Sequence, residues 1–121
     1  NFADLAARRG GFKQPIVVLY DDGHAGTAPV GSFPKGASPF GALDMAGNVY
    51  EWCADFHSSR YYAKSPAKNP PGPDGGSAMA VRGGSWHNTG FNLRCANRSR
   101  LEPSTRSDRV GFRCARDLTS P

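Results

Sequence analysis

The strongest structural signal in this chain is residues 41–52, with the sequence Gly-Ala-Leu-Asp-Met-Ala-Gly-Asn-Val-Tyr-Glu-Trp. The end of this stretch contains a valine and two aromatic residues, which predict a strand over residues 48–53. Asp44 and Glu51 bracket a Gly-Asn pair, and both residues of that pair tolerate unusual backbone angles. Such a turn can direct carbonyl oxygens toward a calcium ion, which takes about six to eight oxygen ligands. These residues leave open the alternative that Asp44 caps a turn and Glu51 faces solvent.

Short strands separated by long loops are predicted on both sides of this stretch. Before it, residues 16–20 (Ile-Val-Val-Leu-Tyr) predict a short buried strand that ends at an Asp-Asp-Gly turn. After it, residues 79–82 and 111–115 predict two more strands. The remaining long segments are expected to be irregular: 1–14, 27–40 and 63–77.

Composition limits the fold and the partners. The chain has 121 residues, enough for one domain, and its 15 Gly and 10 Pro make about one residue in five a breaker of helices and strands. This excludes a helical bundle, a coiled coil and a doubly wound α/β fold. No apolar run approaches the roughly 20 residues that span a bilayer, so no membrane is expected. The densest arginine stretch, residues 94–116, contains one aromatic residue, Phe112, and we therefore expect no nucleic-acid partner.

The three cysteines leave the compartment open. Cys53, Cys95 and Cys114 are too far apart in sequence for a CxxC metal or redox motif. A zinc site shared with histidines, one disulfide with a free thiol, and buried free thiols are all compatible with this count. We expect a soluble protein that is either secreted or periplasmic, or cytoplasmic.

Five motifs occur along the chain in a characteristic order. Together they resemble the C-terminal half of the formylglycine-generating enzyme domain, also called the sulfatase-modifying factor domain. The motifs are Thr-Ala-Pro-Val-Gly-Ser-Phe (27–33), Phe-Gly-Ala-Leu-Asp-Met-Ala-Gly-Asn-Val-Tyr-Glu-Trp (40–52), Val-Arg-Gly-Gly-Ser-Trp (81–86), Arg-Cys-Ala-Asn-Arg (94–98) and Gly-Phe-Arg-Cys (111–114).

The resemblance implies an α+β, C-type-lectin-like fold with low regular secondary structure, short strands and long ordered loops. It assigns residues 1–116 to the C-terminal half of that domain and residues 117–121 to a tail. It also implies that the N-terminal half of the domain is a partner, supplied by the same chain or by a second one.

The resemblance further implies two structural calcium sites, each built from side chains and carbonyl oxygens. The first set consists of the side chains of Asn1 and Asp22 with the carbonyls of Phe2 and His24. The second set consists of the side chains of Asp44 and Glu51 with the carbonyls of Gly47 and Val49.

Catalysis is where the sequence departs from the family. The oxidase of this family binds copper(I) through two cysteines that follow the Gly-Gly-Ser motif, and thiolates are the natural ligands of that ion. Here residues 86–94, directly after Ser85, contain no cysteine. We therefore expect no copper, and a diverged relative of the oxidase that converts a sulfatase cysteine to formylglycine. Whether such an oxidoreductase-like protein is an enzyme stays open.

The alternative is a non-catalytic module that binds a peptide or protein ligand. The resemblance includes the variable proteins of diversity-generating retroelements, which display their variable residues on the segment that corresponds to residues 86–109. Either reading uses the same pocket candidates: Ser85, Trp86, His87, Phe91 and Arg109.

The resemblance also bears on the thiols. In relatives from oxidising compartments, the positions of Cys95 and Cys114 bridge to the N-terminal half. We therefore expect no disulfide among the three cysteines of this chain.

Overall fold

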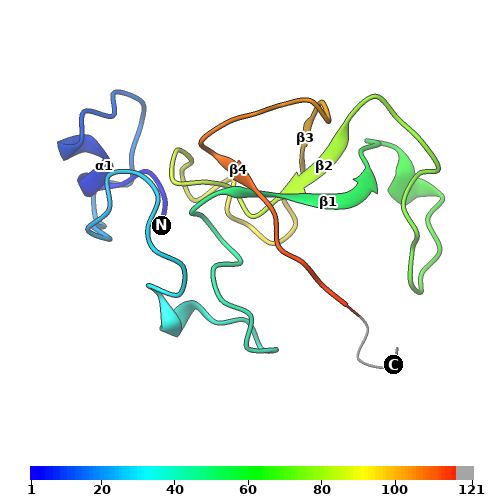
Figure 1. Cartoon of the computed structure of the whole chain (residues 1–121), viewed down its shortest axis with the longest axis horizontal. Coiled ribbons are helices and arrows are strands. Elements are labelled where there is room, and N and C mark those ends of the chain that lie inside the picture. The colour runs from blue at the N-terminus through cyan, green and yellow to red at the C-terminus, as the bar shows by residue number, and fades with distance from the viewer. Residues whose placement is uncertain (117–121) are drawn as a thin grey trace.

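A mixed sheet forms the regular part of the fold (Figure 1). The computed structural model describes residues 1–116. Within them the sheet has four strands in the order β3-β2-β1-β4. The elements in chain order are α1 (Leu5–Arg9), the 3-10 turn η1 (Pro34–Gly36), β1 (Tyr50–Phe56), the 3-10 turn η2 (Tyr61–Ala63), β2 (Met79–Arg82), β3 (Ser99–Leu101) and β4 (Val110–Gly111).

Strand β1 lies at the centre of the contacts that organise the sheet. It pairs antiparallel with β2, placing Trp52 opposite Val81, and the register shifts before Phe56. On its other edge it pairs in parallel with the short β4, placing Tyr50 opposite Val110. The sheet therefore brings the start of β1, the end of β2 and the chain after β4 to one place.

The strand predicted at 79–82 is confirmed as β2. The strand predicted at 48–53 is confirmed in part as β1, which begins two residues later and ends three residues later. The strand predicted at 111–115 is shorter and begins one residue earlier, as β4. Strand β3, which pairs with β2, was not predicted. These differences are small because each strand is short and ends at a turn.

The prediction of a buried strand at residues 16–20 is wrong. The only pairing there within residues 1–116 is an isolated bridge between Asp4 and Val17. Leu19 is 94% exposed and Val18 is 63% exposed. Ile16 and Val17 are half-buried, and Tyr20 accepts a 3.1 Å hydrogen bond from the N–H of Leu5 at the start of α1. No strand pairs along the run within the described residues, so its β propensity is not realised.

The prediction that residues 1–14 are irregular is wrong in part, because α1 lies within them. The buried carboxylate of Asp4 caps this helix by accepting a 2.8 Å hydrogen bond from the N–H of Ala6. Its other oxygen accepts a 2.6 Å bond from the N–H of Asp22. One side chain thus joins the helix to the loop that carries the first predicted calcium set.

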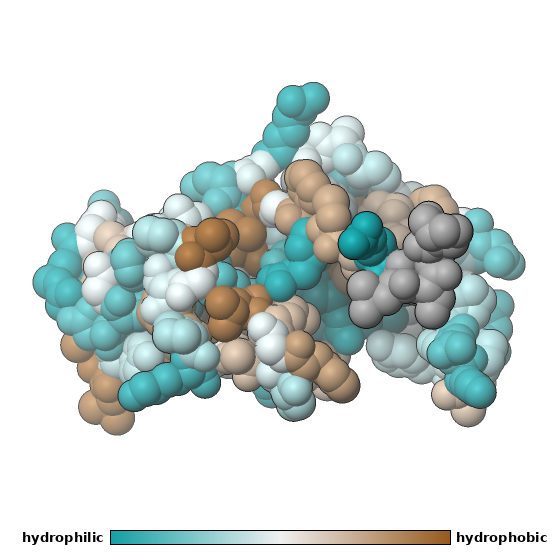
Figure 2. Space-filling view, turned by 60° about the horizontal axis from the view of Figure 1, so that its bottom comes forward, coloured by the Kyte–Doolittle hydropathy of each residue, from teal (hydrophilic) through white to brown (hydrophobic). Residues whose placement is uncertain are grey.

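The described chain has a small core and a large apolar surface. The buried hydrophobic residues are five alanines and Val81, whereas large side chains such as Val30, Phe40 and Phe112 are 87%, 96% and 76% exposed. The chain exposes 8711 Å², while a compact protein of 12.9 kDa exposes roughly 6,300 Å². Figure 2 shows hydrophobic surface gathered near the middle of one face.

The helices of the described residues are short. None of them is long and apolar enough to cross a membrane. The predicted tail, residues 117–121, lies outside the described residues.

Candidate functional site

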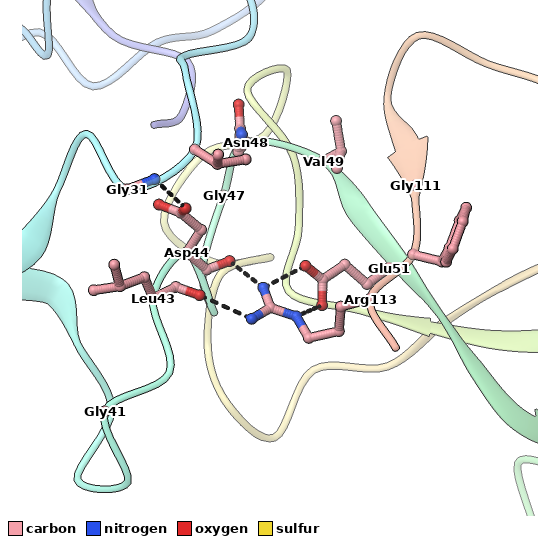
Figure 3. A pocket seen from close by; sticks show the side chains of 12 residues that line it. Gly31, Gly41, Leu43, Asp44, Gly47, Asn48, Val49, Glu51, Gly111 and Arg113 are labelled. Carbon is pink, nitrogen blue, oxygen red and sulfur yellow. Dashed lines mark hydrogen bonds and ion pairs between the residues drawn. The ribbon is translucent and has the colours of Figure 1, made fainter. Parts of the chain in front are cut away.

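The second predicted calcium set lines a cavity of about 670 Å³ at the start of β1 (Figure 3). Asp44 has a φ of 55°, which lies in the left-handed region that non-glycine residues seldom adopt. Its Oδ2 accepts a 2.7 Å hydrogen bond from the N–H of Gly31. The Asp44 side chain therefore turns toward the preceding loop and holds it, while the carboxylate of Glu51 points toward the guanidinium of Arg113 (Figure 3).

The guanidinium of Arg113 occupies the space between these acidic residues. Its Nε donates a 2.6 Å hydrogen bond to one carboxylate oxygen of Glu51, and its Nη2 forms an ion pair with the other. The same group donates to the carbonyls of Leu43 and Asp44, at 2.9 Å and 3.1 Å. The pKa of Arg113 is raised, first by its hydrogen bonds to Glu51. A calcium ion at Glu51 would compete with this cation.

Asn48 connects the turn to two distant loops. Its φ of 63° places its side chain so that Oδ1 accepts a 2.9 Å bond from the N–H of Ala28, while Nδ2 donates 3.2 Å to the carbonyl of the same residue. The backbone N–H of Asn48 donates to the carbonyl of Asn1, and its carbonyl accepts from the N–H of Trp86. The hydrogen bonds of this one residue therefore connect both predicted calcium sets with the turn at Ser85.

The first predicted calcium set contains a buried oxygen without a partner. Within residues 1–116, Oδ1 of Asn1 accepts no hydrogen bond, while Nδ2 of Asn1 donates 2.6 Å to the carbonyl of Gly26. The Asp22 carboxylate lies beside this residue, with Oδ2 3.8 Å from the Asn1 amino group. Asp22 also accepts bonds from the N–H groups of Phe2 and His24, at 3.2 Å and 2.9 Å. The unpartnered amide oxygen of Asn1 is the feature of this set that fits an oxygen-preferring cation such as calcium, whereas the Asp22 carboxylate lies beside the positively charged amino group of Asn1.

Neither set could hold a metal ion through charged side chains alone. Among the described residues, no three His, Cys, Asp or Glu side chains gather into a metal-binding group. Any calcium bound here would depend on carbonyl and amide oxygens as well as one or two carboxylates.

The pocket candidates are brought together only in part. Ser85, His87 and Arg109 line a pocket of about 270 Å³ between β1, the turn after β2 and the loop before β4. Trp86 and Phe91 do not line it. Trp86 donates a 3.4 Å bond from Nε1 to the carbonyl of Asp108, while Phe91 is 66% exposed.

The chemistry of this pocket is polar and contains no thiol. Ser85 is buried, and its hydroxyl donates a 2.9 Å bond to Oδ1 of Asn88, which also accepts from the Ser85 N–H. Partial burial lowers the pKa of His87, and the positive charge of Arg109 lowers it further. The imidazole of His87 is therefore neutral near pH 7, beside a permanent cation.

The cysteines lie away from this pocket. Cys53 is half-buried on β1, and burial is the main cause of its raised pKa. Cys95 and Cys114 are exposed, and the three thiols are unbridged within the described chain. Among residues 1–116, no cysteine lines the Ser85 pocket.

Three contributors to these sites were missed by the sequence analysis. The ring of Phe12 packs edge-on against His87 with centroids 4.5 Å apart, and nothing near Phe12 in the sequence signals this. The position of Asn88, three residues after Ser85, is a local pattern that could have indicated the hydrogen bond between them. Arg113 meets Glu51 across 62 positions, beyond the reach of local patterns.

Comparison with known proteins places these features in a family. The family model described as "Sulfatase-modifying factor enzyme 1-like domain" matches residues 4–118. The formylglycine-generating enzyme of Streptomyces coelicolor is 47% identical over 112 residues, which are 88% of this chain and 35% of that protein. The chain thus spans about a third of the length of such a relative.

Two solved structures are similar in fold. PvdO from Pseudomonas aeruginosa superposes with a TM-score of 0.66 and 37% identity, covering 75% of this chain and 34% of that structure. The variable protein 1 of Treponema denticola superposes with a TM-score of 0.61 and 33% identity, covering 73% of this chain and 31% of that structure. The expected fold class, α+β with low regular secondary structure, is confirmed by these neighbours. Sequence, fold and motif order agree that the chain belongs to the sulfatase-modifying factor family, which includes the formylglycine-generating enzymes.

Proposed function

We propose that this chain is part of a diverged sulfatase-modifying-factor domain that does not oxidise cysteine through copper. The observation that carries this proposal is the make-up of the Ser85 pocket. Asn88 takes up the Ser85 hydroxyl, and His87 and Arg109 supply the remaining polar groups. These are nitrogen and oxygen donors, whereas copper(I) requires soft sulfur ligands.

The test is an assay on a peptide that carries a sulfatase-type cysteine. The protein is incubated with the peptide with and without copper, and the peptide mass is measured. An unchanged mass in both arms is expected, with the formylglycine-generating enzyme of Streptomyces coelicolor as the positive control. Conversion of the peptide by this chain would overturn the proposal.

A second candidate function is ligand binding at the same pocket. It is favoured by the fold likeness to a protein whose name is variable protein 1, and by a pocket of about 270 Å³, which suits one side chain of a peptide or protein better than a whole organic ligand. Arg109→Ala should then weaken peptide binding, whereas Arg106→Ala, at an exposed arginine that does not line the pocket, should leave it unchanged. Equal affinity in both variants would contradict this role for the pocket.

Calcium stabilisation is proposed first at the Asn1 and Asp22 set. The orphaned Oδ1 of Asn1 supports it, because a cation there would satisfy a buried acceptor that otherwise costs free energy. At the second set we propose that calcium and Arg113 are alternatives, because both require the carboxylate of Glu51.

The rest of a sulfatase-modifying-factor domain is proposed to cover the exposed apolar surface of this chain. The support is the area of 8711 Å², which exceeds that of a compact protein of this mass by about 2,400 Å². That excess matches the area buried in large permanent interfaces. Leu19, Val30, Phe40 and Phe112 would lie within it, because each is more than three-quarters exposed in the described chain.

A further inference from the structure

A polar cleft lies at the other end of the sheet and shares two lining residues, Leu101 and Thr105, with the Ser85 pocket. It has a volume of about 700 Å³ and opens where β1 ends, β2 begins and β3 ends. Three strand ends meet there because β2 runs antiparallel to both of its neighbours. The cleft is lined mainly by hydroxyl and cationic side chains: His57, Ser58, Ser59, Ser77, Arg100 and Thr105.

The charge in and around the cleft is predominantly positive. Arg98 anchors the wall by donating 2.9 Å to the carbonyl of Ser58, and its guanidinium lies 4.2 Å from the ring centre of Tyr62. Arg100 is exposed, and no side-chain hydrogen bond or ion pair holds it within residues 1–116. Glu102 is the one carboxylate among the lining residues.

The imidazole of His57 lies within this positive field. Burial lowers the pKa of His57 first, and the charges of Arg98 and Arg100 lower it further. The backbone N–H of His57 is bonded to the carbonyl of Ala78, which fixes the residue at the cleft wall. An anion placed in the cleft would favour the protonated imidazole and reverse part of that lowering.

The hydroxyl groups are suited to an oxyanion. Ser58 Oγ accepts a 3.3 Å bond from the N–H of Arg60, so its own proton is available to donate. Ser59, Ser77 and Thr105 add three more hydroxyl donors. Several hydroxyl donors, an arginine and a titratable histidine are the groups that bind phosphate and sulfate oxygens in proteins.

We infer that this cleft, which we call the 57–105 cleft, binds a phosphate-like oxyanion between His57, Arg100 and the surrounding hydroxyl groups. The cleft is wider than an inorganic ion, so it also accommodates the organic part of a phosphate or sulfate monoester. The cleft shares Leu101 and Thr105 with the Ser85 pocket, but His57 and Arg100 do not line that pocket. None of its lining residues belongs to the predicted calcium sets, so its ligand would be independent of calcium.

The test is a pH titration of the histidine side chains by NMR, in phosphate and in sodium chloride of equal ionic strength. The pKa of His57 should be about half a pH unit higher in phosphate, which corresponds to roughly threefold tighter binding to the protonated form. An equal pKa of His57 in phosphate and chloride would overturn the inference.

Two variants distinguish a specific anion site in the cleft from nonspecific attraction of phosphate to a basic protein. Arg100→Gln should abolish most of the phosphate effect on His57, whereas Arg106→Gln, at an exposed arginine outside the cleft, should preserve it. Equal loss in both variants would mean an adventitious ion only and would contradict the inference. Replacing phosphate by phenyl phosphate distinguishes the sources: tighter binding assigns the cleft to an organic monoester, and equal binding assigns it to the free ion.

Discussion

Replacing Arg113 by methionine should destabilise the chain by about 2.5 kcal/mol. Methionine keeps much of the aliphatic length but removes the two hydrogen bonds to the carbonyls of Leu43 and Asp44 and the ion pair with Glu51. Each carbonyl bond contributes about 1 kcal/mol. The ion pair is only partly buried, with side chains 38% and 22% exposed, so it adds about 0.5 kcal/mol.

The assay is thermal unfolding of the wild type, Arg113→Met and the control Arg116→Met in calcium-free buffer. A complete domain of 121 residues would shift by roughly 4 °C per kcal/mol, and because this chain is expected to unfold with less than half of the enthalpy of such a domain, each kcal/mol corresponds to about 8 °C or more. Arg113→Met should therefore lower the midpoint by roughly 20 °C. Arg116 lies on the same exposed segment and has no side-chain bond within the described chain, so its variant should change the midpoint by less than about 2 °C.

A double-mutant cycle with Glu51→Gln then isolates the ion pair. The coupling free energy between positions 51 and 113 should be about 0.5 kcal/mol in favour of the wild-type pair. A midpoint for Arg113→Met that equals the midpoint of the control would refute the reasoning, because it would mean that the contacts of the guanidinium do not stabilise the fold.

The remaining predictions concern metal, pH and thiols. Calcium at 100 times its dissociation constant should stabilise the chain by roughly 2.7 kcal/mol. Asp22→Asn should abolish most of this stabilisation, and Arg113→Met should enlarge it. Equal unfolding midpoints with calcium and with a chelator would contradict calcium binding. The pKa of His87 is lowered on folding from its usual 6.5, so the stability that the neutral imidazole contributes is present above pH 6.5 and is lost as the pH falls from there through the lower folded pKa. The free energy of urea unfolding of His87→Gln should therefore depend less on pH in that window than that of the wild type. An identical pH profile for the two proteins would contradict this. Thiol titration of the denatured, unreduced chain should find three free thiols, and one free thiol would mean that a bridge had formed.

The sequence predicted the elements whose partners lie within the chain. The strands predicted at residues 48–53 and 79–82 form because the two segments pair with each other in an antiparallel register. The run at 16–20 has the same β propensity but pairs with no strand among the described residues beyond the single bridge to Asp4, and its residues 18–20 stay exposed. Local propensity becomes structure only when packing supplies a second surface.

The helix α1 was missed because its signal is short. Five residues, Leu-Ala-Ala-Arg-Arg, follow an aspartate cap, and the surrounding glycines and proline dominate the pattern of that segment. The capping role of Asp4 depends equally on Asp22, which lies 18 positions later. The role of a side chain that joins two segments cannot be predicted from either segment alone, because the contact exists only when both are folded.

The residues of the candidate sites were likewise predicted only in part. Ser85, His87 and Arg109 were named from motifs and do line one pocket. Trp86 is adjacent in sequence but turns to Asp108, because successive residues of a turn point in different directions. The competition between Arg113 and calcium could not be predicted, because it arises from a contact between β1 and the chain after β4.

The central claim is that this chain is one part of a domain and depends on the rest of it for cooperative stability. Differential scanning calorimetry of the chain alone tests the claim most directly. A complete domain of 121 residues would absorb about 85 kcal/mol on unfolding near 60 °C. We predict a broad transition with less than half of that enthalpy, because the buried core consists of five alanines and one valine. A single sharp transition with the full enthalpy would contradict the account.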